Sequence, residues 1–376
     1  MTRARDIADL SSVSARLDTV GGSSGALSNR NMIINGAMQI AQRATQSTNA
    51  SSTGYKTLDR YYHEMKVNTD QFTYTTEQVS DAPSGFSKSF KITCTTAETA
   101  LASDEYGRIY QAIEGNNLER IGFGTSDAKQ TTLSFYVKSS LTGNFSASFY
   151  VNDANVIYSQ AYTINAANTW ERKTLTFPAY TTAGPNIDNT QGAIINFGLF
   201  AGSGSNTAST NWATYAQANL LGGQTASIAG TLNATWQITG IQLEVGDTAT
   251  DFEHRKFSEE LQACQRYYFQ EDTNFGNVSG RLGVANSTTS VTFDHTLPVQ
   301  MRANPSLSLT SANLRIGDTV SQGFTTTSGT VTISSYSGSA CAVYNLNQFS
   351  GLTSYRTYLH EPDTTSTGIV VFNAEL

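Results

Sequence analysis

Charged side chains are scarce in this chain: they make up 14% of its 376 residues, and the formal net charge is -7 at pH 7. Lysine and arginine never form a run longer than two residues. A protein that binds nucleic acid carries a basic patch or stripe that neutralises phosphates. The composition therefore excludes nucleic acid as an expected partner.

Long apolar runs are absent as well. No stretch approaches the roughly 18 apolar residues that span a bilayer. The N-terminus, with Arg3 and Arg5, lacks the apolar centre of a secretory signal peptide. We expect no membrane insertion and no export by that route.

Cysteine occurs only at Cys94, Cys264 and Cys341. An odd number of widely separated cysteines argues against a disulfide framework, and the C-x-x-C spacing of a metal site does not occur. The sequence predicts that all three are small, buried apolar residues. It also favours synthesis in a reducing cytoplasm.

Catalytic and metal-binding patterns are missing too. The four histidines show neither H-x-H nor H-E-x-x-H spacing. The adjacent carboxylates Asp104-Glu105 and Glu259-Glu260 would point apart on a strand or a helix, so neither pair is a catalytic couple. We interpret Glu253-His254-Arg255 as charges that fix a turn at a domain junction. We expect no enzyme activity, no cofactor and no metal.

The sequence is rich in Ser, Thr, Asn, Gln and Gly, with 30 Gly and only 6 Pro. This composition is typical of many short strands joined by tight turns. β-branched and aromatic enrichment predicts strands over residues 72–79, 89–95, 132–139, 144–151, 169–177, 193–200 and 235–245. Eight or so antiparallel strands in two sheets make a jelly roll, so we predict a jelly-roll β-sandwich over residues 31–256.

Residues 257–376 are predicted to begin with a linking helix. Ser258 can cap it, and one side then carries Leu261, Cys264 and Tyr268, which we expect to pack between two domains. Short strands follow over residues 290–293, 306–309, 330–334, 340–344 and 368–373. The predicted fold class is therefore all-β, with a second, smaller β-sandwich at the C-terminus.

Residues 1–30 have a different pattern. Apolar residues spaced by three and four predict a short helix, with its stripe at Ile7, Leu10, Val13, Leu17 and Val20. Gly21-Gly22 ends this helix and begins a flexible linker. We expect the stripe to pack against sister chains or to dock on a larger particle, with packing on its own domain as the alternative.

Several longer segments share a recognisable pattern. They are TRARDIADL from Thr2, NMIINGAMQIAQR from Asn31, TLDRYY from Thr57, and ITGIQLEVG from Ile238 with the FEHR and EELQACQRYY segments that follow. Over roughly residues 1–270 the chain resembles tail fibre and receptor-binding proteins of marine and freshwater tailed phages. The segments TWERKTLTFP and IQLEVG also resemble strands of carbohydrate-binding modules with a jelly-roll fold.

The resemblance implies a virion protein of the phage tail that holds the tail or an adaptor protein through its N-terminus. It further implies a homotrimer that mediates host adhesion by binding surface polysaccharide. It implies no chemistry. Two alternatives stay open: a tailspike that depolymerises polysaccharide, and a head or capsid decoration fibre without enzymatic activity.

Glycan recognition needs flat aromatic faces and a few polar groups for sugar hydroxyls. Two of the three tryptophans fall in predicted strands, and we expect them in the core. Trp212 and Tyr215 lie in a polar loop instead, where binding residues are common. Tyr355 and Tyr358 lie among polar residues near the C-terminus. We predict these four as glycan-binding candidates.

Overall fold

The computed structural model describes residues 29–50, 53–67, 72–209, 211–272, 282–309, 315–318, 324–325, 333–335, 339–347, 349–361 and 369–376. The chain divides into two compact units between Phe257 and Ser258. The predicted N-terminal helix, with Ile7, Leu10, Val13, Leu17 and Val20, lies outside the described residues.

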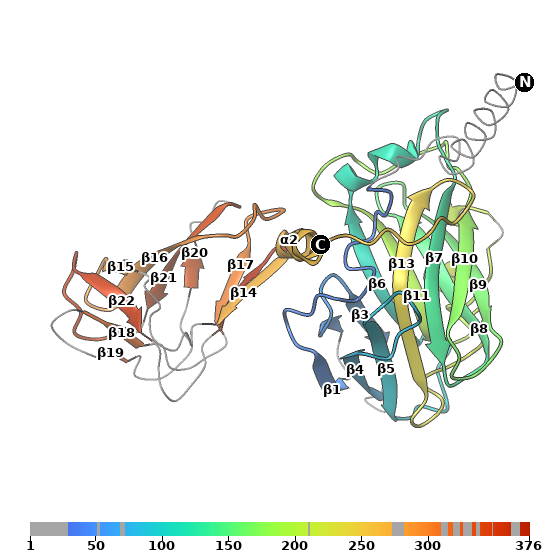
Figure 1. The fold of residues 1–376 in the computed structure, drawn as a ribbon, viewed down its shortest axis with the longest axis horizontal. Coiled ribbons are helices and arrows are strands. Elements are labelled where there is room, and N and C mark those ends of the chain that lie inside the picture. The colour runs from blue at the N-terminus through green and yellow to red at the C-terminus, as the bar shows by residue number, and fades with distance from the viewer. Residues whose placement is uncertain are drawn as a thin grey trace, which may run out of the picture. The chain divides into compact units, whose positions relative to one another are not determined.

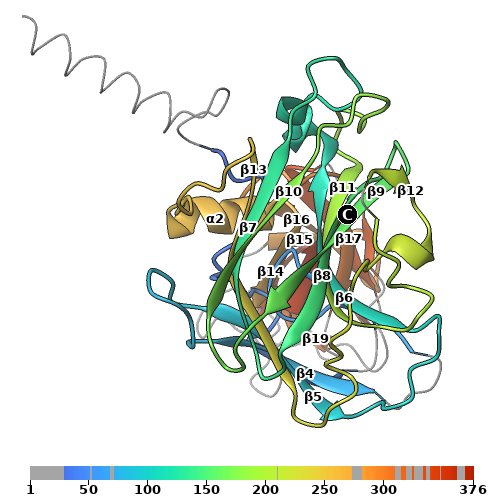
Figure 2. The same ribbon diagram turned by 90° about the vertical axis from the view of Figure 1, so that its right-hand side faces the viewer.

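The described part of the first unit consists of two antiparallel sheets (Figure 1, Figure 2). The six-stranded sheet has the order β1 (Gln46–Ala50), β4 (Thr73–Val79), β5 (Ser89–Thr96), β13 (Thr235–Val245), β7 (Thr131–Ser139) and β10 (Glu171–Phe177). The seven-stranded sheet has the order β12 (Ala213–Thr214), β9 (Val156–Ile164), β8 (Gly143–Val151), β11 (Gln191–Ala201), β6 (Tyr106–Glu114), β3 (Tyr62–Lys66) and β2 (Gly54–Tyr55).

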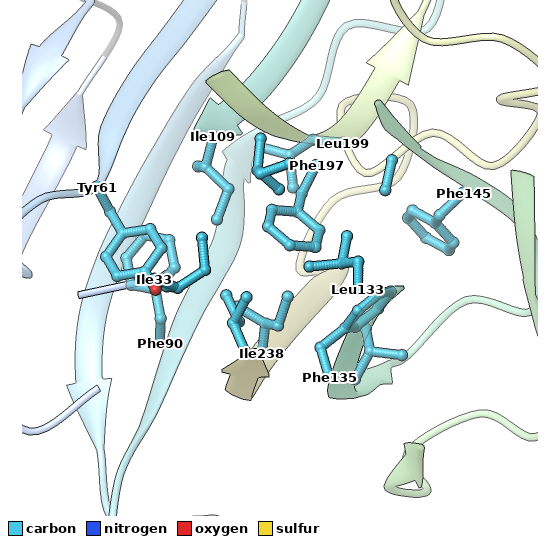
Figure 3. Packing of buried hydrophobic residues seen from close by; sticks show 14 of the residues in the cluster. Ile33, Tyr61, Phe90, Ile109, Leu133, Phe135, Phe145, Phe197, Leu199 and Ile238 are labelled. Carbon is cyan, nitrogen blue, oxygen red and sulfur yellow. The ribbon is translucent and has the colours of Figure 1, made fainter. Parts of the chain in front are cut away.

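The core of this unit lies between the two sheets (Figure 3). Phe135 of β7 and Ile238 of β13 meet Ile109 of β6 and Phe197 of β11, and each of the four is at most 1% exposed. Burial of such a side chain stabilises the fold by about 1.5–3 kcal/mol. Because successive residues of a strand face opposite sides, the alternate residues of these strands form the outer surfaces of the sandwich.

The all-β class and the sandwich are confirmed. All seven strands predicted for this unit are present, with ends within two residues of the prediction. The prediction missed β1, β2, β3, β6, β9 and β12. In β6 all residues but one are buried, so its sequence lacks the apolar and polar alternation by which a half-buried strand is recognised.

The segment of residues 31–43 is bound to β13 by the Asn31 side chain. Its Nδ2 donates to the carbonyl oxygen of Ile241 at 3.0 Å, and its Oδ1 accepts from the amide of Leu243 at 3.1 Å. The backbone amide of Asn31 donates to the Glu253 carboxylate at 2.9 Å. The points where the chain enters and leaves the sandwich are therefore held together, which agrees with the structural interpretation of Glu253.

The second unit contains the helix α2 (Phe257–Gln265), except for its first residue, and two antiparallel sheets. One sheet has the order β14 (Tyr268–Asp272), β23 (Ile369–Asn373) and β17 (Ser306–Leu309). The other has the order β19 (Phe324–Thr325), β18 (Arg315–Gly317), β22 (Thr357–Glu361), β15 (Leu282–Ala285), β16 (Ser290–Thr296), β21 (Cys341–Asn347) and β20 (Ile333–Ser335). Phe293 and Phe372, one from each sheet, share one buried cluster.

Two predictions for this unit need correction. Cys264 on α2 is buried and Leu261 is half-buried, but Tyr268 is the first residue of β14 and does not lie on the helix. The helix ends earlier than its apolar spacing indicated, because Tyr268 pairs with Asn373 of β23. Cys94 is buried as predicted, whereas Cys341 is exposed.

Candidate functional site

Trp212 lies in a loop as predicted, but its indole is held by the core. The ring meets Phe123 and Phe149 edge-on, with centroids 5.5 and 5.6 Å away. Its Nε1 donates to the carbonyl oxygen of Pro178 at 2.9 Å. The ring closes the edge of the sandwich and anchors the loop, so we do not propose Trp212 as a stacking residue.

Tyr215, in the same loop, is placed differently. Its half-buried ring lies 4.8 Å from that of Tyr150 on β8. It also packs beside a small buried cluster that includes Tyr106 and Leu220. The loop therefore carries Tyr215 to the outer surface of the seven-stranded sheet.

The two C-terminal candidates differ in exposure. Tyr355 is 87% exposed, whereas Tyr358 is 1% exposed and belongs to the core of the second unit. The Tyr358 hydroxyl accepts a hydrogen bond from the amide of Thr353 at 2.8 Å. Tyr358 faces the core because β22 presents its residues alternately inward and outward. Its burial removes Tyr358 from the surface aromatics that can contact a sugar.

A row of side chains that the sequence prediction missed crosses the outer surface of the seven-stranded sheet. On neighbouring strands, Tyr55 is opposite Tyr62, Tyr62 is opposite Tyr110, Tyr110 is opposite Asn196, and Asn196 is opposite Ser148. Directly opposite residues project from the same face of a sheet, about 5 Å apart. The Tyr62 ring lies 4.9 Å from each of the other two tyrosine rings. The row therefore sets three half-buried aromatic rings side by side, whereas Asn196 and Ser148 at its other end are fully buried.

A charged pair lies next to this row. Glu64 of β3 is opposite Arg108 of β6, and the Arg108 Nε and a terminal nitrogen donate to one Glu64 oxygen at 3.1 and 2.6 Å. The other terminal nitrogen donates to the Asn196 amide oxygen at 2.6 Å, and Asn196 donates to the Ser148 hydroxyl at 3.0 Å. The guanidinium also lies 4.8 Å from the centre of the Tyr110 ring. These contacts fix the half-buried Glu64 beside the rings, while Arg108, Asn196 and Ser148 are themselves buried.

We call this surface the aromatic face. Its members are Tyr55, Tyr62, Glu64, Arg108, Tyr110, Ser148, Tyr150, Asn196 and Tyr215. The strands that supply most of them, β3, β6, β11 and β8, are consecutive in the sheet (Figure 1).

The phenols of Tyr62, Tyr106 and Tyr110 stay protonated at ordinary pH. Burial raises the pKa of Tyr62, Tyr106 and Tyr110 above the usual value for a phenol, and the nearby Glu64 carboxylate raises it further. The Tyr106 hydroxyl also donates to Glu64. These hydroxyls are therefore neutral groups that donate and accept hydrogen bonds.

One sequence signal could have located this face. Tyr106, Arg108 and Tyr110 alternate at period two in the segment EYGRIYQAI, which places all three on one side of a strand. Tyrosine is both a strand former and a largely apolar residue. Because apolar residues occur on both sides of this strand, the alternation of Tyr106, Arg108 and Tyr110 did not stand out in the sequence. The pairing with Glu64 and Asn196 depends on strand order and could not be read from spacing.

Among the described residues, no group of three or more His, Cys, Asp or Glu side chains is arranged to hold a metal ion. Within the same part of the chain, no helix is long and apolar enough to cross a membrane.

No protein-family model matches the chain, and no curated protein matches it in sequence. Solved structures similar to it include the enzymatically active domain of tailspike protein 4 from bacteriophage CBA120 (15% identity, TM-score 0.30). That match covers 57% of this chain and 21% of the tailspike chain, so this chain spans about a fifth of its length.

Two carbohydrate-binding modules are also similar. One is a family 11 module from Clostridium thermocellum in complex with a β-1,3-1,4-mixed-linked tetrasaccharide (10% identity, TM-score 0.27), covering 56% of this chain and 99% of the module. The other is a family 61 module in complex with β-1,4-galactotriose (10% identity, TM-score 0.24), covering 58% of this chain and 99% of the module. At these scores the likenesses assign no function to this chain.

Proposed function

We propose that this protein is a tail fibre of a phage virion whose first unit recognises a host-surface glycan through the aromatic face. The three half-buried rings of Tyr55, Tyr62 and Tyr110 carry the glycan part of the proposal. Aromatic rings stack on the C–H faces of sugars, and the phenol hydroxyls of the rings match sugar hydroxyls. The segments of residues 31–43 and 238–268, which resemble phage tail fibres, support the virion part.

The proposal includes attachment through residues 1–30 and assembly into a homotrimer located in the tail. A trimer presents three aromatic faces, and linked sites raise avidity without any new contact. Removal of residues 1–30 should then abolish incorporation into virions while tryptophan fluorescence of the sandwich stays native. Light scattering that gives a monomer mass for the intact protein, or normal incorporation of the truncated one, would contradict this part.

The binding test removes two rings from the centre of the row. Tyr62→Ala combined with Tyr110→Ala should raise the Kd for purified host-surface polysaccharide about thirtyfold, since each stacking contact contributes about 1 kcal/mol beyond area burial. The matched control is Tyr136→Ala, which removes a half-buried tyrosine from β7 in the other sheet. The control should bind as the wild type does.

The readout is depletion of each variant from solution by immobilised polysaccharide, after circular dichroism has established that the variant is folded. Equal binding by the double variant and the wild type would refute the aromatic face as the glycan site. New reducing ends released during the incubation would favour the depolymerase alternative. A chain located on the capsid by electron microscopy would favour the decoration fibre.

A further inference from the structure

The charges on the aromatic face are paired with one another. Arg108 is bound to Glu64 at 2.6 Å, and only 9% of the Arg108 side chain is exposed. At the edge of the same surface Lys66 of β3 lies 3.1 Å from Asp104 and donates to the amide oxygen of Gln217 at 2.9 Å. Two cations are thus matched by two carboxylates, and the Arg43 guanidinium over the Tyr55 ring likewise lies 3.7 Å from the Asp59 carboxylate.

Each of the three nitrogens of the Arg108 guanidinium already has a hydrogen-bond partner. Its Nε and one terminal nitrogen bind Glu64, its other terminal nitrogen binds Asn196, and the Tyr110 ring lies 4.8 Å from it. A sugar carboxylate or sulfate that approached it would lie beside the Glu64 carboxylate. The ligand anion and the Glu64 carboxylate would repel each other, and Glu64 already neutralises the charge of Arg108.

We propose that the aromatic face selects uncharged glycans, with Glu64 as the residue that excludes acidic ones by occupying Arg108. This inference rests on the proposed glycan-binding function. The neutral phenols of Tyr62 and Tyr110 supply groups that match hydroxyls and not anions. Binding should therefore be insensitive to salt, because no net charge is neutralised when the complex forms.

The decisive variant is Glu64→Gln, which keeps one oxygen to accept from Arg108, turns an NH2 group toward the Tyr106 hydroxyl, and removes the negative charge. Arg108 then becomes an uncompensated cation. The variant should gain binding to a polyuronate by at least about tenfold over the wild type in about 20 mM salt, and lose the gain in about 0.5 M salt, where charges are screened.

A matched control makes the same charge change on the other sheet. Glu77 of β4 lies 3.8 Å from Lys91 of β5, so Glu77→Gln also removes the carboxylate of an ion pair. It should gain no polyuronate binding. Asp104→Asn, which uncovers Lys66 at the edge of the face, serves as a second variant and should gain binding more weakly than Glu64→Gln.

The measurement is binding of the full chain to an array of neutral glucans, mannans and galactans, polyuronates and sulfated polysaccharides. Wild-type binding to a neutral polymer at both salt concentrations supports the inference. Salt-sensitive wild-type binding to an acidic polymer that Tyr62→Ala abolishes would overturn the inference while leaving the glycan function intact. Folded Glu64→Gln and Asp104→Asn variants without any gain would also overturn it. Absence of wild-type binding to every polymer counts against the glycan function itself, and the Glu64→Gln gain then tests the charge argument alone.

Discussion

His63 makes the first unit sensitive to acid. It is fully buried in β3, and its ring centroid lies 5.9 Å from that of Tyr74 and 5.3 Å from that of Phe90. Neither ring nitrogen has a hydrogen-bond partner among the described residues. Burial, with a smaller contribution from the Lys56 charge, lowers the pKa of His63 to about 3. The folded protein therefore keeps this imidazole neutral where the unfolded chain would protonate it.

The size of the effect follows from this difference in pKa. Unfolded histidine has a pKa of about 6.5, so acidification below that value favours the unfolded state, and the loss of stability grows until the pH approaches 3. Between about pH 7.5 and pH 5 the loss amounts to about 2 kcal/mol for this one group. For a domain of this size that corresponds to a fall in Tm of about 4–8 °C.

His63→Leu should remove this dependence, and it should not destabilise the protein at neutral pH, because no hydrogen bond is lost. All three tryptophans, Trp170, Trp212 and Trp236, lie in the first unit, so urea unfolding followed by their fluorescence reports on that unit within the intact chain. His254→Gln, at an exposed position, is the control and should behave as the wild type does. If the stability of His63→Leu and of the wild type fell in parallel between pH 7.5 and pH 5, the reasoning would be wrong.

Three further predictions concern packing and exposure. A Cβ at Gly36 would overlap the Ile241 carbonyl oxygen, so Gly36→Ala should lower the free energy of unfolding in urea by about 1–3 kcal/mol. Unchanged stability would show that the backbone around Gly36 can shift away from β13 at little cost. Trp212→Ala should lower the free energy of unfolding, followed by circular dichroism, by about 3 kcal/mol, because it leaves a cavity at the edge of the core. A loss of glycan binding without a loss of stability would instead identify Trp212 as a glycan contact. Cys341 should react with a maleimide in the native protein while Cys94 stays unmodified until unfolding, as read by peptide mass spectrometry, and equal labelling would contradict the assigned burial.

The sequence by itself determined the all-β class and most strand positions in the first unit. Strands such as β4 (Thr73–Val79) are recognisable because their side chains alternate between a buried and a less buried surface, and that period is a local property of the chain. Turn residues between the strands are likewise local. The proposed virion context also rests on sequence alone, through the resemblance carried by segments such as residues 31–43.

Tertiary structure decided which side chains meet. Tyr62, Arg108 and Asn196 lie on three strands far apart in the sequence, and they become neighbours only because β3, β6 and β11 are consecutive in one sheet with a fixed register. The same long-range packing places the ring of the loop residue Trp212 against the core, and it buries Tyr358. Spacing along the chain specifies on which side of a strand a residue lies. Strand order specifies which residues of other strands become its neighbours, and that order arises when long loops close over a shared core.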